Sequence, residues 1–235
     1  MIKIVSFKIC PFVQRVTALL EAKKIPYEIE YISLKDKPDW FLALSPTGQV
    51  PLLVTEAGSA LFESDAIVEY VDEISKPLEE NLTPEQRAVN RAWSYQASKH
   101  YLVQCSAMQS GNRESLEEKK KKLDSAFSKV EKKLEGGPFF GGINIGNVDI
   151  AWLPLLHRAA IIQNHSDYDF LEKFPKVKRW QAALSDTELY EKSVAVDFVD
   201  AFKGLYLSER TYLGGSGLDK ALLGKESQTG GCCNS

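Results

Sequence analysis

The sequence has few of the residues that build metal centres or disulfide frameworks. Its 235 residues include four cysteines and three histidines. The cysteines are Cys10, Cys105, Cys232 and Cys233, and they form neither a disulfide framework nor a metal-ligand spacing. We therefore expect no structural disulfide and no metal. Free thiols fit the reducing surroundings of the cytoplasm.

Strong net charge and long apolar runs are also missing. The formal net charge of −3 at pH 7 gives no electrostatic case for binding nucleic acid. No run of about eighteen apolar residues occurs, so no segment is expected to span a membrane. Residues 1–7 contain no basic leader and no cleavage site, which argues against a signal peptide. With 44% hydrophobic and 26% charged residues, the composition is that of a globular chain that can bury a core.

Residues 1–76 alternate between strand and helix patterns. Strands are predicted at residues 2–7, 27–32, 49–54 and 60–62, and helices at 11–24, 39–44 and 63–74. Ser64 or Asp65 is expected to cap the last of these helices. A parallel strand pair joined to an antiparallel hairpin, with helices on its faces, predicts an α/β domain.

Only helices are predicted after a polar, proline-marked linker at residues 77–83. They are expected at residues 84–110, 114–135, 146–162, 174–183 and 188–207. Thr83 and Pro84 fit the cap and the first position of the first helix. Asp149 is expected to accept a hydrogen bond from the N–H of Gly146. Residues 208–235 are rich in Gly, Ser and Lys and are interpreted as a mobile tail.

Cys10 lies at the junction between the first predicted strand and the first predicted helix, with Pro11 at the first helical position. The positive helix end and its free N–H groups favour a thiolate, which would make Cys10 reactive. Position alone leaves open a small, inert buried cysteine. Val13 occupies the position three residues later, so no Cys-x-x-Cys partner is present. Cys105 is interpreted as a core residue of its helix.

An ordered set of short motifs resembles the cytosolic glutathione transferase superfamily over about residues 1–205. The motifs are Cys10-Pro11-Phe12, Val50-Pro51, Glu63-Ser64, Phe139-Phe140-Gly141-Gly142, Asn147-Val148-Asp149-Ile150-Ala151 and Phe174-Pro175 with Trp180. Cys-Pro-Phe-x-x-Arg with the stretch at residues 34–40 resembles the cysteine-type classes, omega above all, then lambda and dehydroascorbate reductase. Gly146 replaces the family's capping Ser or Thr, and the end at residues 232–235 is not part of the family pattern.

The resemblance implies a thioredoxin-like domain followed by a helical bundle, with glutathione bound by the first domain. It implies a cis peptide before Pro51, so that Val50 offers its backbone to the peptide, while Lys37 binds the glycyl carboxylate. Ser64 and Glu63 suit the γ-glutamyl carboxylate and ammonium, respectively. Phe12, like Phe7, would form an apolar wall. A simple helix cap, an ordinary loop lysine and plain core packing are the structural alternatives for these residues.

A cysteine in the catalytic position implies thiol–disulfide exchange with glutathione as co-substrate. Cys10 would attack a small-molecule or protein mixed disulfide, take up its glutathionyl group, and be released by a second glutathione in a monothiol cycle. Dehydroascorbate reduction is the family's related activity. Ser6 is the alternative catalytic group, but its hydroxyl lies before the loop and not at the helix N-terminus. Tyr95 and Lys99 are candidates for the second-substrate wall.

Intracellular chloride channel proteins share a Cys-Pro-Phe-x-Gln-Arg stretch with this chain, so the alternative function is a binding or regulatory protein with little turnover. Dimers dominate the superfamily, which implies a homodimer, although lambda and dehydroascorbate reductase members are monomers. Cys232-Cys233-Asn234-Ser235 has the spacing of a prenylation box. A membrane association is expected only if this end is lipidated.

Overall fold

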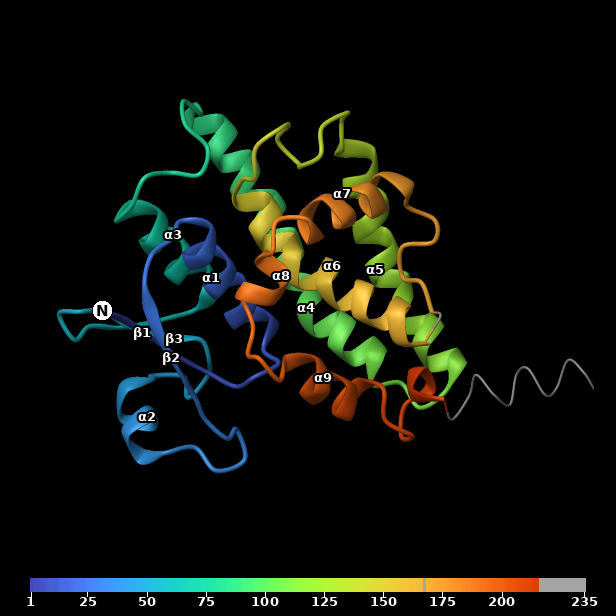
Figure 1. Ribbon diagram of the computed structural model, residues 1–235, viewed down its shortest axis with the longest axis horizontal. Helices are drawn as coiled ribbons and strands as arrows, with labels where there is room; N and C mark the ends of the chain where they lie inside the picture. Colours follow the sequence, from blue (N-terminus) through green and yellow to red (C-terminus); the bar gives the residue numbers. More distant parts are fainter. Residues whose placement is uncertain (167, 216–235) are drawn as a thin grey trace, which may run out of the picture.

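The computed structural model describes residues 1–166 and 168–215 (Figure 1). Its first part alternates strands and helices, as predicted. In chain order these elements are β1 Ile2–Ser6, α1 Pro11–Ala22, β2 Tyr27–Tyr31, α2 Asp39–Leu44, β3 Leu52–Val54, β4 Ala60–Phe62 and α3 Ser64–Glu73.

The four strands form one mixed sheet in the order β2-β1-β3-β4. β1 pairs in parallel with β2, placing Ile4 beside Ile29, and antiparallel with β3, placing Ile4 beside Leu53. β3 and β4 form the antiparallel hairpin. This arrangement confirms the predicted thioredoxin-like combination of a parallel pair with a hairpin.

The two faces of the sheet bury different sets of side chains, because successive residues of a strand point to opposite sides. Ile4 and Leu53 join the main hydrophobic core with α1 and α3. Val5 and Leu52 instead form a small cluster with Phe41 of α2. Figure 1 shows α2 away from the α1–α3 pair, so the sheet lies between helices.

The second part of the described chain is helical. Its elements are α4 Pro84–Met108, α5 Arg113–Lys133, α6 Asn147–Ser166, α7 Pro175–Ser185, α8 Leu189–Lys192, α9 Phe198–Tyr206 and the short 3₁₀ helix η1 Tyr212–Gly214. Thr83 caps α4 as predicted. Its hydroxyl accepts from the Gln86 N–H (3.2 Å), and the Gln86 side chain accepts from the Thr83 N–H (2.8 Å).

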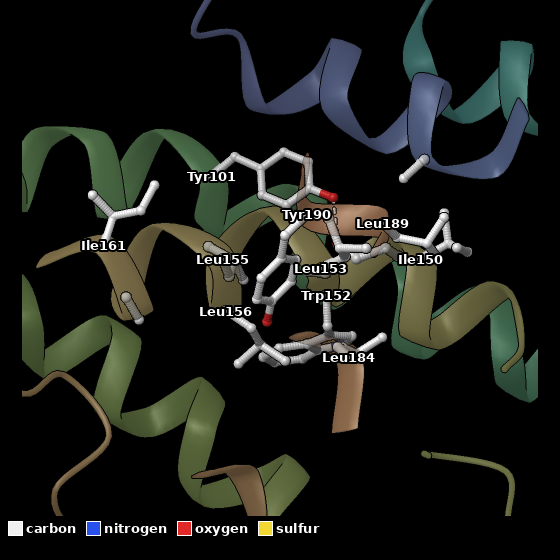
Figure 2. Close-up of a cluster of buried hydrophobic side chains, with 14 of the residues drawn as sticks. Tyr101, Ile150, Trp152, Leu153, Leu155, Leu156, Ile161, Leu184, Leu189 and Tyr190 are labelled. Carbon is white, nitrogen blue, oxygen red and sulfur yellow. Dashed lines mark hydrogen bonds between the residues drawn. The ribbon is translucent and has the colours of Figure 1, made fainter. Parts of the chain in front are cut away.

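Helix α6 is the centre of the helical part and is buried on nearly all sides. Figure 2 shows Trp152, Leu153 and Leu156 of this helix among side chains from α4, α7 and α8. Asp149 accepts from the Gly146 N–H at 2.7 Å, as predicted. It also accepts from the Phe140 N–H at 2.8 Å and from Trp180 Nε1 at 2.6 Å, so one carboxylate joins the start of α6 to the preceding loop and to α7.

The predicted helix at residues 188–207 is wrong as a single element. It is two helices, α8 and α9, separated at residues 193–197. The break brings Ser193 against α1, where its carbonyl accepts from Thr17 Oγ1 at 2.7 Å. The apolar spacing on both sides of the break gave no sign of this long-range contact.

Several further boundaries differ from the predictions, two of them with a clear structural reason. The N-cap of α3 is Glu63, so Ser64 is the first helical residue and neither Ser64 nor Asp65 caps the helix. The predicted tail at 208–235 starts too early, because Tyr212 and Leu213 are buried and the Tyr212 N–H donates to the Ser110 carbonyl at 2.7 Å. The lipidation box at residues 232–235 lies outside the described residues.

The two parts share one hydrophobic core, in which α1 packs against α3 on one side and α4, α6 and α8 on the other. We propose that the domain boundary lies at residues 77–83, between α3 and α4. None of the helices in residues 1–166 and 168–215 is long and apolar enough to cross a membrane.

Candidate active site

Cys10 is the N-cap residue of α1, and Pro11 is the first helical residue, as the sequence predicts. The Cys10 N–H donates to the Phe7 carbonyl at 3.2 Å, which closes a tight turn after β1. The Cys10 carbonyl accepts from the Gln14 N–H at 3.1 Å and so begins the helix. The cysteine is 5% exposed.

The electrostatic surroundings of Cys10 combine opposing effects. Burial raises the pKa of its thiol to about 11. The N–H groups of Val13 and Phe12 and the charge of Arg158 act in the other direction. The predicted helix donors are therefore present, but burial outweighs their effect on this pKa. With this pKa the side chain is a thiol at neutral pH.

A cavity of about 580 Å³ opens between the start of α1, the loop before β3, the start of α3, and helices α4 and α9. All of the predicted catalytic and glutathione-binding residues line this one cavity. They are Cys10, Phe12, Lys37, Val50, Pro51, Glu63 and Ser64.

The backbone around Val50 and Ser64 has groups to offer a peptide ligand. The Val50–Pro51 bond is cis, and Val50 makes no backbone hydrogen bond with the rest of the described chain. Ser64 is buried at the first position of α3, where helix N–H groups have no intrahelical partner. Glu63 is exposed and has φ 65°, a backbone conformation that costs a non-glycine residue about 1 kcal/mol or more.

Lys37 and Phe12 also make contacts within the fold. The Lys37 Nζ donates to the Gly48 carbonyl at 2.8 Å, which ties together two loops at the rim of the cavity. The Phe12 ring meets Tyr101 of α4 edge-on, with centroids 5.1 Å apart. Each residue thus has a structural role, and each still borders the cavity.

Helix α4 borders the cavity, as expected for the second-substrate wall, but the residues that line it were missed. Leu102, Cys105, Ser106 and Gln109 of α4 line it together with Leu205 and Tyr206 of α9. The α4 positions follow helical spacing, i, i+3, i+4 and i+7, and this stripe was the available signal. Cys105 is half-buried and packs against the main core, as predicted, but it also borders the cavity, which was not predicted.

The predicted second-substrate residues lie elsewhere. Tyr95 borders a different cavity, and its hydroxyl donates to Glu69 Oε1 at 2.8 Å. Lys99 is exposed on α4 and does not line the Cys10 cavity. The error is one of position along the helix: Tyr95 lies on the same face of α4 as Leu102, but about two turns nearer the start of the helix.

Arg158 of α6 is a second residue that sequence reasoning missed. It is fully buried directly behind Cys10, and its Nη2 donates to the Ile9 carbonyl at 3.0 Å. Its Nη1 donates to Gln14 Oε1 and to the Pro154 carbonyl. Among the described residues no carboxylate pairs with this guanidinium, and its Nε has no hydrogen-bond partner. An arginine in a strongly apolar helix gave no separate signal in the sequence.

Gln14, the glutamine of the first-helix motif, has a structural position between the two parts of the molecule. Its Nε2 lies 2.8 Å from His157 Nδ1. The His157 ring stacks on Tyr190 and Phe198, with centroids 4.5 and 5.3 Å away. Burial lowers the pKa of His157 to about 3, so the imidazole is neutral at physiological pH. Within the described ranges no group of three His, Cys, Asp or Glu side chains could hold a metal ion.

A thioredoxin-like sheet joined to a helical domain, with a helix-capping cysteine at the cavity between them, defines a glutathione transferase fold. Comparison with known families agrees. Residues 9–74 match the glutathione S-transferase N-terminal domain, and residues 95–188 match the C-terminal domain. The chain belongs to the glutathione S-transferase family.

Individual relatives carry the names of two classes of the family, omega and DHAR. The chain is 29% identical to glutathione S-transferase omega-1 of Sus scrofa, over 88% of this chain and 86% of the relative. It is 30% identical to the probable glutathione S-transferase DHAR1, cytosolic, of Oryza sativa subsp. japonica, over 79% and 84%. The crystal structure of glutathione transferase Omega 3C from Trametes versicolor matches with a TM-score of 0.71 and 25% identity, over 83% of this chain and 89% of that one.

Proposed function

We propose that this protein is a glutathione-dependent thiol transferase of the cysteine type. The observation that carries the proposal is the meeting of Cys10, Val50 and Ser64 at one cavity. These residues supply a nucleophile, a free peptide edge and a helix start, which are the three elements that a small anionic thiol peptide needs. The omega and DHAR relatives support the same chemistry.

Glutathione is proposed to lie with its cysteinyl unit along the Val50 backbone. Its γ-glutamyl carboxylate meets Ser64 and the free N–H groups of α3, and Glu63 binds the adjacent ammonium. Lys37 at the loop rim binds the glycyl carboxylate, and Phe12 forms an apolar wall beside the sulfur. This orientation directs the glutathione thiol towards Cys10.

The reaction is thiol–disulfide exchange. The Cys10 thiol loses its proton to water. The resulting thiolate attacks the glutathionyl sulfur of a mixed disulfide, forms Cys10–S–SG and releases the substrate thiolate, which takes up a proton from water. A second glutathione thiolate attacks this adduct, giving glutathione disulfide and free Cys10. The N–H groups of Phe12 and Val13 stabilise the thiolate once its proton has left. Dehydroascorbate reduction by the same thiolate is a related proposed activity.

The cellular location and the oligomeric state of the protein are proposed as well. A cytoplasmic location is supported by a relative whose name includes the word cytosolic. A homodimer is proposed from the superfamily, with the monomer as the other outcome, and light scattering measures which is present.

The test is an assay with glutathione and a small glutathionyl mixed disulfide. Wild-type protein is expected to turn over, and Cys10→Ala is expected to be inactive. Cys10→Ser serves as the matched control, because it keeps the size of the side chain while removing the sulfur. Tight glutathione binding by the wild type without turnover would instead favour a binding or regulatory protein resembling the chloride channel proteins.

A further inference from the structure

The described chain contains a second cysteine at the cavity. Cys105 of α4 lines the same cavity as Cys10, and both thiols are free. Tyr206 of α9 lines the same cavity, and burial together with the neighbouring Cys105 raises the pKa of its hydroxyl. Cys105 is therefore a second free thiol at the same cavity, whereas the proposed monothiol cycle uses only Cys10.

The buried positive charge of Arg158 interacts with both thiols. Arg158 has no carboxylate partner among the described residues, and the ionisable groups that act on it are Cys105, Tyr206, Cys10 and Tyr101. Both thiols border one cavity, and negative charge on Cys105 raises the pKa of Cys10. One thiolate can thus form beside the guanidinium while the other sulfur stays uncharged, which is the arrangement that exchange requires.

We propose that Cys105 is a second redox-active thiol that displaces glutathione from Cys10 and leaves a Cys10–Cys105 disulfide across the cavity. The inference rests on the proposed exchange of glutathione at Cys10. It adds a branch to that cycle, which operates when free glutathione is scarce.

The branch balances with glutathione disulfide as oxidant. Cys10 thiolate attacks glutathione disulfide, forming Cys10–S–SG and releasing one glutathione thiolate. Cys105 thiolate then attacks the Cys10 sulfur, forming the internal disulfide and releasing the second glutathione. The two protein thiols lose two electrons and two protons, and the oxidant becomes two molecules of glutathione. Two molecules of glutathione reverse the process.

The disulfide has a functional consequence. It joins the α4 wall to the start of α1, with Cα atoms drawn to about 4.4–6.8 Å, as disulfide geometry requires. Cys10 can then attack no substrate, and its sulfur is protected from further oxidation. During turnover with abundant glutathione, the incoming glutathione thiol competes with Cys105 for the adduct.

The test is peptide mapping after oxidation of the full chain with glutathione disulfide, without reduction. Cleavage after Lys and Arg places Cys10 in the peptide at 9–15, Cys105 in that at 100–113, and the last two cysteines in that at 226–235. The expected product is peptide 9–15 linked to 100–113, with the loss of two hydrogens. Cys105→Ser is expected to stop at Cys10 carrying one glutathionyl group. A background with Cys232→Ser and Cys233→Ser controls for the tail thiols.

The outcomes separate the two proposals. If wild type stops at glutathionylated Cys10, as Cys105→Ser does, the role of Cys105 is overturned and the proposed function stands. If Cys10 takes no glutathione in Cys105→Ser, the proposed function fails. In that case a second experiment with diamide, a thiol oxidant that needs no glutathione, tests the Cys10–Cys105 disulfide. A link between peptides 9–15 and 100–113 supports this disulfide, and the absence of the link overturns it.

Discussion

The guanidinium of Arg158 donates to the carbonyl of Ile9, the residue before Cys10, at 3.0 Å. A residue of the helical part thereby fixes the loop that presents the nucleophile of the thioredoxin-like part. The same cation lowers the pKa of the Cys10 thiol against the effect of burial. The site is consequently a product of both parts of the fold.

Loss of the Arg158 charge should slow the reaction of Cys10. In Arg158→Leu the thiolate loses a cation that stabilises it, so the Cys10 pKa rises and alkylation by iodoacetamide at fixed pH slows by about tenfold, the effect of one pKa unit. Arg158→Lys keeps the charge and should recover part of the rate. Arg179→Leu, at an exposed site on α7, is the control. Equal alkylation profiles for Arg158→Leu and wild type would contradict the electrostatic role.

The pH dependence of Cys10 alkylation follows from its raised pKa. The reactive species is the thiolate, and burial sets the thiol pKa at about 11. The rate on peptide 9–15 should therefore rise about tenfold per pH unit from pH 7 to pH 10. A plateau below pH 8 would mean that the helix N–H groups outweigh burial.

Ser64 should act on glutathione affinity more than on turnover. Ser64→Ala removes a hydroxyl that is proposed to donate to the γ-glutamyl carboxylate, and hydrogen bonds to charged groups contribute about 1.5–3 kcal/mol. The KM for glutathione should rise by about tenfold or more, while kcat changes less. Ser59→Ala, in the exposed turn between β3 and β4, is the matched control. An unchanged KM in Ser64→Ala would remove Ser64 from the site.

Asp149 should matter for stability. Its carboxylate accepts from the N–H groups of Phe140 and Gly146 and from Trp180 Nε1. Asp149→Ala leaves these buried donors unpaired and should lower the free energy of unfolding by about 3–5 kcal/mol. Asp149→Asn retains an acceptor oxygen and should lose less. Denaturant unfolding measures both against Asp186→Ala at an exposed site, and equal stability of Asp149→Ala and wild type would contradict this role.

The sequence predicts this fold well where the deciding contacts are local. The β1–α1 junction, the Thr83 cap and the Asp149 turn all depend on residues a few positions apart. Long-range contacts decide the features that were missed. The break at Ser193 depends on Thr17, and the position of Arg158 depends on the Ile9 carbonyl. The cavity wall at Cys105 could be predicted only in part. Its helical stripe is visible in the sequence, but the site that the stripe faces is not.

The covalent intermediate at Cys10 is the central claim, and transfer of a label tests it most directly. Wild-type protein is mixed with a peptide that carries an isotopically labelled glutathionyl group, the reaction is quenched with acid after one turnover, and the cysteine peptides are mapped. The predicted result is the label on peptide 9–15, followed by its release as glutathione disulfide when unlabelled glutathione is added. Passage of the label straight to free glutathione at full rate, with Cys10 never labelled, would contradict the account.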